Sequence, residues 1–230
     1  MADVILALDV PRPRDALALL DRLPEVRWVK VGSVLMTRAG APLIQTLIDR
    51  GLRVFLDLKW HDIPNTVARA VSAARELGVS MATVHTLGGD AMLAAAAAAA
   101  GPELGLVGVT VLTSHDAAEY GRAVGRTEVD VGMEVGRLAG IAIGAGVRGV
   151  VCSPHEVQEL RRRLGREAWI VVPGIRRASD AAGDQRRTAA PEDAVRAGAS
   201  HLVVGRAVLE AHDPVGVYRE IVEAARCPAA

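Results

Sequence analysis

The chain has 230 residues, of which half are apolar, so it is long enough to bury a large core, and we expect a single domain over residues 1–230. Basic and acidic side chains balance at 27 each and only 3% of the residues are aromatic, which excludes the basic, aromatic surface of a nucleic-acid-binding protein. No apolar stretch approaches the roughly 18 residues of a membrane span. The run from Val4 to Leu8 is too short for a signal peptide, so the sequence predicts a cytoplasmic protein without a membrane partner.

Short apolar segments with the pattern of β-strands alternate along the chain with segments of helical periodicity. The expected strands are residues 4–9, 28–31, 53–58, 81–85, 106–111, 148–152, 168–172 and 201–204. The expected helices are residues 14–23, 35–50, 64–77, 90–100, 131–145, 154–164, 191–197 and 214–225.

Eight alternating strand-helix units predict an α/β fold of the (β/α)8 TIM-barrel type, in which active sites lie at the C-terminal ends of the strands. A doubly wound open sheet is the alternative. That fold usually has a glycine-rich phosphate turn after its first strand, whereas this chain has Asp9-Val10-Pro11 there. Residues 174–190 are polar and long for a strand-to-helix connection, and we interpret them as a lid over the site.

The third expected strand leads into the segment 56–66, L-D-L-K-W-H-D-I-P-N-T, where an apolar run is followed by charges and a proline. Because side chains of a strand alternate between two faces, Asp57 and Lys59 are expected to stand side by side on one face. Pro64 suits the first turn of a helix, so the connecting turn should begin at Lys59 and contain Asp62.

Lysine is rare in this chain, which has 25 arginines but only Lys30 and Lys59. An ammonium group can give up a proton, and a guanidinium in practice cannot. The two lysines therefore suggest chemistry that needs a proton donor. A structural ion pair at the end of a strand is the alternative explanation.

Nearly every expected strand ends in polar side chains or glycine, and in a TIM barrel these ends meet on one face. A histidine in this place is more often a packing residue than a catalyst, so we leave His85 outside the predicted site. The strand ends are Asp9, Lys30, Asp57 with Lys59, His85, Thr113 with Ser114 just beyond the fifth strand, Ser153, Pro173 with Gly174, and Gly205 with Arg206.

Several motifs that follow one another along the chain in the family's order make the chain resemble the orotidine 5'-phosphate decarboxylase family. The resemblance runs from Asp9 to Arg206, and the combination of motifs is far more specific than any one of them. The motifs are D-L-K-W-H-D-I-P-N-T at 57–66, A-L-D-V at 7–10, K-V-G at 30–32, V-H-T-L-G-G at 84–89, V-L-T-S at 111–114, P-G-I-R at 173–176, G-D-Q-R at 183–186 and V-V-G-R at 203–206.

The resemblance implies decarboxylation of orotidine 5'-phosphate to UMP and CO2, the last step of UMP synthesis, without a metal or organic cofactor. The catalytic residues would be Lys59, Asp57, Asp62 and Lys30, arranged as alternating charges. Loss of CO2 from C6 of the pyrimidine leaves a carbanion with little resonance stabilisation, so a cation must be held at that carbon in a dry site. Lys59 would be this cation and then the acid that protonates C6.

The resemblance also implies substrate contacts and a homodimer with shared active sites, in which Asp62 and Thr66 enter the partner's site. TIM barrels often bind phosphate in the loops after strands seven and eight, where several of these residues lie. The ribose would contact Asp9, Lys30 and Thr66, the base Thr113 and Ser114, and the phosphate Arg176, Gln185, Gly205 and Arg206, with Ile63 and Pro173 as further substrate-binding residues.

Two other functions share parts of this pattern. A magnesium-dependent sugar-phosphate decarboxylase or aldolase of the same suprafamily would carry a metal-binding glutamate after strand two, where this chain has Lys30, and a lysine cannot replace that ligand. A barrel that binds a nucleotide without turning it over is the second alternative, which the intact charge array argues against. Cys152 and Cys227 lack the spacing of zinc ligands and are too few for a disulfide framework.

Overall fold

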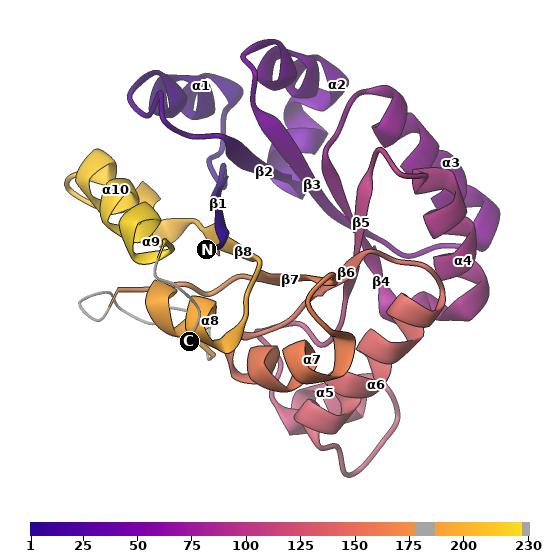
Figure 1. Ribbon diagram of the computed structural model, residues 1–230. Coiled ribbons are helices and arrows are strands. Elements are labelled where there is room, and N and C mark those ends of the chain that lie inside the picture. Colours follow the sequence, from indigo (N-terminus) through magenta and orange to yellow (C-terminus); the bar gives the residue numbers. More distant parts are fainter. Residues whose placement is uncertain (178–186, 227–230) are drawn as a thin grey trace.

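The computed structural model describes residues 1–177 and 187–226, and its strands form one closed, parallel barrel in chain order. β8 pairs with β1, and Figure 1 shows the strands at the centre of the molecule. The (β/α)8 barrel predicted from the sequence is therefore confirmed. The strands are β1 (Asp3–Ala7), β2 (Trp28–Gly32), β3 (Arg53–Trp60), β4 (Met81–His85), β5 (Gly105–Val109), β6 (Gly149–Val151), β7 (Trp169–Val172) and β8 (His201–Val204).

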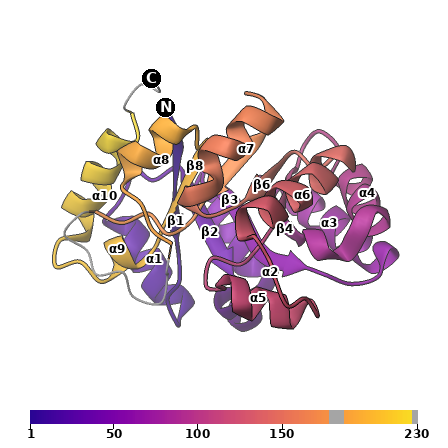
Figure 2. The ribbon, with the colours of Figure 1, turned by 90° about the horizontal axis from the view of Figure 1, so that it is seen from below.

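Helices connect successive strands and surround the barrel (Figure 1). Pairing of β8 with β1 closes the barrel, and α1 and α10 lie on the same side of the molecule (Figure 2). The α-helices are α1 (Pro13–Asp21), α2 (Ser33–Asp49), α3 (Pro64–Glu76), α4 (Gly89–Ala100), α5 (Ala117–Ala123), α6 (Val131–Gly144), α7 (Val157–Leu164), α8 (Pro191–Ala197), α9 (Arg206–Leu209) and α10 (Pro214–Ala224), and short 3-10 helices span Thr86–Gly88 and Pro154–Glu156.

The alternation of side chains along each strand divides the core into two parts. Inward-facing residues fill the barrel, and on β3 this residue is Phe55. The outward-facing neighbours Val54 and Leu56 pack beneath the helices. The barrel interior is thus filled with side chains, which form an apolar floor. An active site can therefore lie only above this floor, at the C-terminal rim of the barrel. The floor comprises Ile5, Ala7, Trp28, Phe55, Met81, Val107, Val171 and Val203.

Several strand limits differ from those predicted, and the differences affect the site. β3 runs on to Trp60, whereas the sequence analysis ended it at residue 58 and placed Lys59 in the turn. β1 ends at Ala7 and β5 at Val109, earlier than predicted. Asp9 therefore lies on a loop beyond the barrel rather than at a strand end, and Thr113, predicted just beyond the fifth strand, lies further along the loop that follows it.

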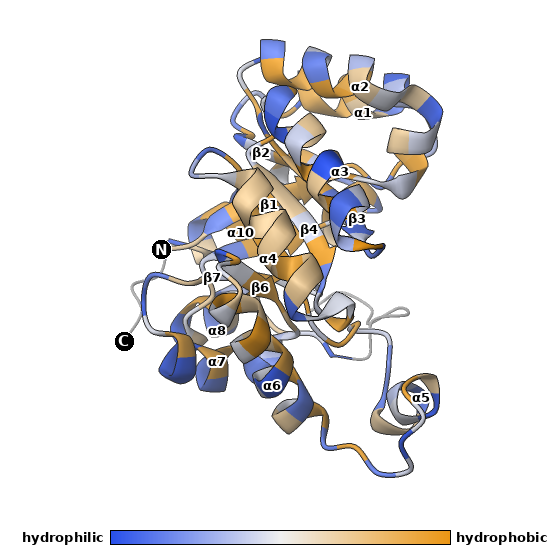
Figure 3. Ribbon diagram, turned by 90° about the vertical axis from the view of Figure 1, so that its right-hand side faces the viewer, coloured by the Kyte–Doolittle hydropathy of each residue, from blue (hydrophilic) through white to orange (hydrophobic). Residues whose placement is uncertain are grey.

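α5 was not predicted and lies apart from the barrel, in the connection between β5 and α6 (Figure 3). Its sequence does carry a helix start signal, because Asp116 caps the backbone of Glu119 while the Glu119 carboxylate accepts from the Asp116 backbone. Tyr120 holds α5 to α6 through a 2.9 Å hydrogen bond to Glu134. Hydrogen bonds from Arg137 above all hold the pKa of Glu134 at about 2, so it remains a buried acceptor.

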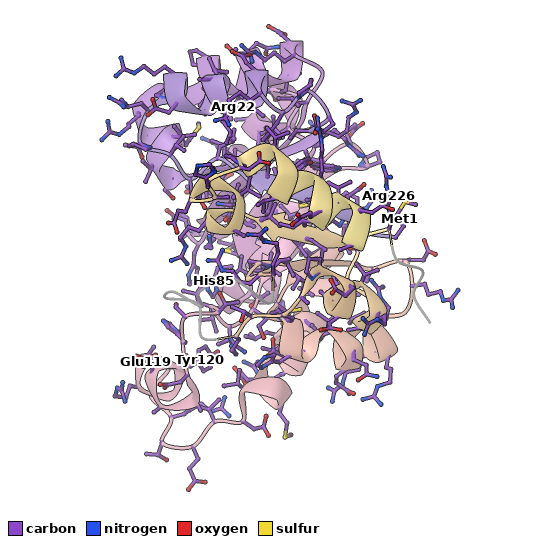
Figure 4. The ribbon with its side chains drawn as sticks, turned by 90° about the vertical axis from the view of Figure 1, so that its left-hand side faces the viewer. Met1, Arg22, His85, Glu119, Tyr120 and Arg226 are labelled. Carbon is purple, nitrogen blue, oxygen red and sulfur yellow. The ribbon has the colours of Figure 1, made fainter. Side chains whose placement is uncertain are left out.

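The opposite end of the barrel joins the first and last described residues. The backbone of Ala2 donates to Ala225 at 3.2 Å, and Figure 4 shows Met1 beside Arg226. Across the described ranges 1–177 and 187–226, no helix combines the length and apolar character needed to cross a membrane.

Candidate active site

A cavity of about 510 Å³ opens at the C-terminal ends of the strands. Phe55 and Ala7 of the apolar floor form its base, so polar groups above them are shielded from water on one side. Most of the residues predicted from the sequence meet here, although they come from six different loops and strands. The predicted residues that line the cavity are Asp9, Lys30, Asp57, Lys59, Thr113, Pro173, Arg176, Gly205 and Arg206.

Four charged side chains of alternating sign form a continuous array along one wall of this cavity. Lys59 Nζ lies 2.8 Å from Asp57 Oδ1, and Lys30 Nζ lies 3.6 Å from Asp57 Oδ2. Lys30 Nζ also donates to Asp9 Oδ1 at 2.9 Å. Asp57 thus lies between two ammonium groups, and Lys59 ends the array within the described part of the chain.

Asp57 is ionised although its side chain is only 14% exposed. Burial is the largest influence on the pKa of Asp57 and raises it. The charges of Lys30 and Lys59, together with hydrogen bonds from Lys59 and Thr83, outweigh burial and bring the pKa below its usual value. The carboxylate therefore keeps its charge and fixes the position of the Lys59 ammonium.

The backbone of β3 departs from regular strand geometry at Lys59. Its φ of 52° makes it the only non-glycine residue with a positive φ in the described part of the chain. The pairing of β3 with β4 shifts register between Leu56 and Trp60. Thr83 stabilises this bulge, because its Oγ1 accepts from Lys59 N at 2.8 Å and donates to Asp57 at 3.1 Å. Strain of this kind persists only where surrounding contacts impose it, and it concentrates at functional sites.

Two arginines reach the rim of the cavity from the ends of β7 and β8. Arg176 follows Pro173 and Gly174, and Arg206 follows Gly205. Arg176 is 9% exposed, and its buried Nε has no hydrogen-bond partner among the described residues. An anion would satisfy this donor, and a guanidinium matches the geometry of a phosphate. This end of the cavity is therefore suited to a phosphate group.

Comparison with known proteins agrees with this arrangement. Residues 2–221 match the family described as Orotidine 5'-phosphate decarboxylase / HUMPS. The chain is 51% identical over 217 residues to orotidine 5'-phosphate decarboxylase of Alkalilimnicola ehrlichii, covering 92% of this chain and 91% of that protein. It is 46% identical over 224 residues to the Opitutus terrae enzyme of the same name, covering 96% of each. The chain belongs to the orotidine 5'-phosphate decarboxylase family.

Family membership predicted from the sequence is thus confirmed, and solved structures agree with the fold. Orotidine 5'-phosphate decarboxylase of Lactobacillus acidophilus has a TM-score of 0.83 and 34% identity, covering 99% of this chain and 100% of that one. An uncharacterized conserved protein of Geobacillus kaustophilus also has a TM-score of 0.83, with 28% identity, covering 97% of this chain and 100% of that one.

Four residues predicted to belong to the decarboxylase site lie outside their own chain's cavity. Asp62, Ile63 and Thr66 are exposed, and Asp62 Oδ1 accepts from the backbone of Ile63 at 2.6 Å. Ser114 is also exposed, whereas its neighbour Thr113 lines the cavity. Within one chain, Thr113 is therefore the better placed of the two for contact with a pyrimidine base.

The predicted lid of this decarboxylase, residues 174–190, is described only at its ends. These ends pair, since Arg176 N donates to Ala189 O at 3.0 Å and Ala189 N donates to Gly174 O at 3.4 Å. Gln185 lies outside the described residues. Its contact with phosphate stays a prediction.

Sequence analysis missed Thr83, which holds both Lys59 and Asp57. The available sign was a hydroxyl among the apolar residues of β4, on the inward-facing side. His85, which we had left outside the site, does not line the cavity and stacks on His61 with ring centroids 5.5 Å apart. Burial first, and then electrostatic interactions with His61 and Lys59, lower the pKa of His85 to about 4, so its ring is neutral at physiological pH.

Proposed function

We propose that this chain decarboxylates orotidine 5'-phosphate to UMP and CO2, the final step of UMP synthesis. The observation that carries the proposal is the array Asp9-Lys30-Asp57-Lys59, which ends in an ammonium group above an apolar floor. Arg176 and Arg206, which are suited to bind a phosphate, lie at the rim of the same cavity. One molecule that carries an anionic pyrimidine and a phosphate can therefore contact both the charge array and these arginines.

Lys59 supplies the positive charge that stabilises the carbanion formed at C6. When the bond between C6 and the carboxylate breaks, the electron pair stays on C6 while CO2 departs. The Lys59 ammonium stabilises this developing charge, then donates a proton to C6 and regains one from solvent. Asp57 contacts Lys59 at 2.8 Å and aims it, while Lys30 balances the second oxygen of Asp57.

The remaining cavity residues position the substrate. Asp9 and Lys30 bind ribose hydroxyls, and Thr113 faces the base. Arg176, Gln185, Gly205 and Arg206 bind the phosphate, far from the reacting carbon, and Pro173 is a further substrate-binding residue. Binding energy from this remote end can order the site for the chemical step, which is the purpose of a lid.

Turnover by the purified protein is expected to be unchanged by EDTA. Lys30 stands where metal-dependent relatives need an acidic ligand, and the described ranges 1–177 and 187–226 hold no cluster of three or more His, Cys, Asp or Glu side chains able to bind a metal ion. The rate is followed by the change in absorbance as orotidine 5'-phosphate is consumed. Loss of activity on chelation, restored by Mg²⁺, would instead support the sugar-phosphate relatives.

We further propose that two chains form a homodimer with shared active sites. A second opening of about 440 Å³ lies beside the charge array and includes Asp57 and Lys59 in its wall. Its other wall carries Val34, whose exposed fraction is 57%. On the same chain, Ile63 is 66% exposed next to Asp62, in the turn that leads into α3.

A neighbouring chain would account for both the second opening beside the charge array and the exposed Ile63. Its Ile63 would cover apolar surface such as Val34, and its Asp62 would extend the alternating charges past Lys59. Thr66, which is exposed in the first turn of α3, would accompany Asp62 toward the ribose. A two-fold axis makes this exchange reciprocal, so each site would receive the same residues from its partner.

Mixing two inactive variants tests the shared site. Lys59→Ala and Asp62→Ala are each expected to be nearly inactive. After dissociation, mixing and reassociation, each mixed dimer has one site with both lesions and one with neither. An equal random mixture should therefore regain roughly a quarter of wild-type activity, by two-fold statistics.

The matched control mixes Lys59→Ala with Lys30→Ala, because both lysines line the cavity of their own chain. Every site in that mixture keeps one lesion, and activity should not return. If the Asp62 mixture behaves like this control after verified subunit exchange, the site is built within a single chain.

We also propose that the enzyme works in the cytoplasm without a nucleic-acid or membrane partner. The balanced charge and low aromatic content support this, as does a substrate that is a small, highly charged nucleotide.

A further inference from the structure

Ser153, at the end of β6, is a polar strand-end residue to which the reaction gives no role. It is completely buried, and its hydroxyl and backbone N–H donate to Glu156 Oε2 at 2.5 and 2.9 Å. The second oxygen of Glu156 accepts from Arg187 Nη1. The side chains of Glu156 and Arg187 are only 9% and 14% exposed, so this is a buried ion pair next to the cavity loops.

Arg187 also contacts the loop after β5. Its Nη2 donates to the carbonyl oxygen of Leu112 at 3.2 Å, and both Leu112 and Thr113 line the active-site cavity. One terminal nitrogen of the guanidinium, Nη1, therefore binds Glu156. The other, Nη2, binds the backbone next to Thr113, the residue proposed to face the base.

The third connection of Arg187 runs along its own chain. Two residues later, Ala189 pairs with Gly174 and Arg176 through backbone hydrogen bonds of 3.4 and 3.0 Å. Arg176 is the buried guanidinium at the phosphate end. Arg187 thus joins the segments that follow β5, β6 and β7, and its hydrogen bonds go to Glu156 and Leu112, which lie outside the charge array.

We propose that Arg187, anchored by Glu156, is a positioning residue that couples the phosphate-binding segment at Arg176 to the base-facing loop at Thr113. The proposal rests on the proposed function. When the phosphate binds Arg176, the backbone pairing of Arg176 with Ala189 holds Arg187 in place. Arg187 in turn holds the backbone of Leu112, which positions Thr113. A guanidinium is required because two separate directions of hydrogen bonding must be met at once, which the single ammonium of lysine does not reproduce.

Two substrates on the same preparation measure this coupling. For orotidine 5'-phosphate, Arg187→Met and Glu156→Gln are each expected to lower kcat/KM by about tenfold or more, since misplacement of positioning groups has effects of this size. For orotidine, which lacks the phosphate, the loss should stay below about threefold, because nothing engages Arg176. Arg187→Lys should fall between wild type and Arg187→Met.

The ratio of the two kcat/KM values does not depend on the fraction of folded enzyme, so partial unfolding of a variant cannot mimic the result. Arg196→Met is the matched control, because Arg196 forms an exposed ion pair with Asp193 on α8 and does not line the cavity. It should leave the ratio unchanged.

Equal losses for both substrates, or no loss for either, would overturn the coupling. The coupling can also be measured in the same variants without turnover, by calorimetric titration with UMP and with uridine. There too, Arg187→Met should weaken UMP and spare uridine. An inactive wild type with this selective effect would contradict the proposed reaction while leaving the coupling intact, and equal effects on both ligands would contradict the coupling.

Discussion

Lys59→Ala is expected to lower turnover of orotidine 5'-phosphate by about three orders of magnitude or more, since removal of one group that stabilises transition-state charge has effects approaching this size. Lys59 also donates the proton, so the variant loses two functions at once. The alanine leaves Asp57 with one close ammonium, that of Lys30 at 3.6 Å. The measurement is kcat and kcat/KM of the purified variant against wild type.

Lys59→Arg is the matched control for charge. It keeps a cation near Asp57, but a guanidinium does not release its proton under these conditions. We expect this variant to remain strongly impaired. Thermal unfolding of both variants shows whether the barrel is intact. A fall of less than about tenfold for a folded Lys59→Ala protein would contradict the assigned role.

Loss of a phosphate contact should be the second large effect. Arg206→Ala and Gln185→Ala are expected to lower kcat/KM for orotidine 5'-phosphate on the order of 100-fold, as for loss of a hydrogen bond to a charged group. Orotidine should be a poor substrate and largely indifferent to both changes, because its binding draws on neither residue. Steady-state kinetics with both substrates provide the comparison.

Arg219→Ala serves as the control, because Arg219 pairs with Glu25 at the opposite end of the barrel and does not line the active-site cavity. It should leave both substrates unaffected. Equal sensitivity of the two substrates to Arg206→Ala would mean that the arginine supports the fold rather than the phosphate.

Much of this arrangement could be predicted because it depends on local periodicity. The two-residue period of β3 correctly placed Asp57 and Lys59 on the cavity side, and eight strand-helix units predicted closure into a barrel. Polar residues at the strand ends then had to converge on one rim. Asp9, Lys30 and Arg206 meet there although they are far apart in the sequence.

Features that depend on contacts between segments could not be predicted in this way. The positive φ of Lys59 is accompanied by a hydrogen bond from its backbone N–H to Thr83 on the next strand, and no local pattern encodes that pair. Arg187 is one of 25 arginines, and its importance becomes visible only when Glu156 and Leu112 are found beside it. α5 is a different case, since its capping signal was present but short.

The central claim is that this chain turns over orotidine 5'-phosphate and does not merely bind it. The most direct measurement is the product balance of the purified wild-type protein, with UMP quantified by chromatography and CO2 trapped separately. We predict one UMP and one CO2 for each substrate molecule consumed, over many turnovers per chain. Saturable binding of UMP with no release of CO2 from orotidine 5'-phosphate would contradict the account and identify a barrel that only binds the nucleotide.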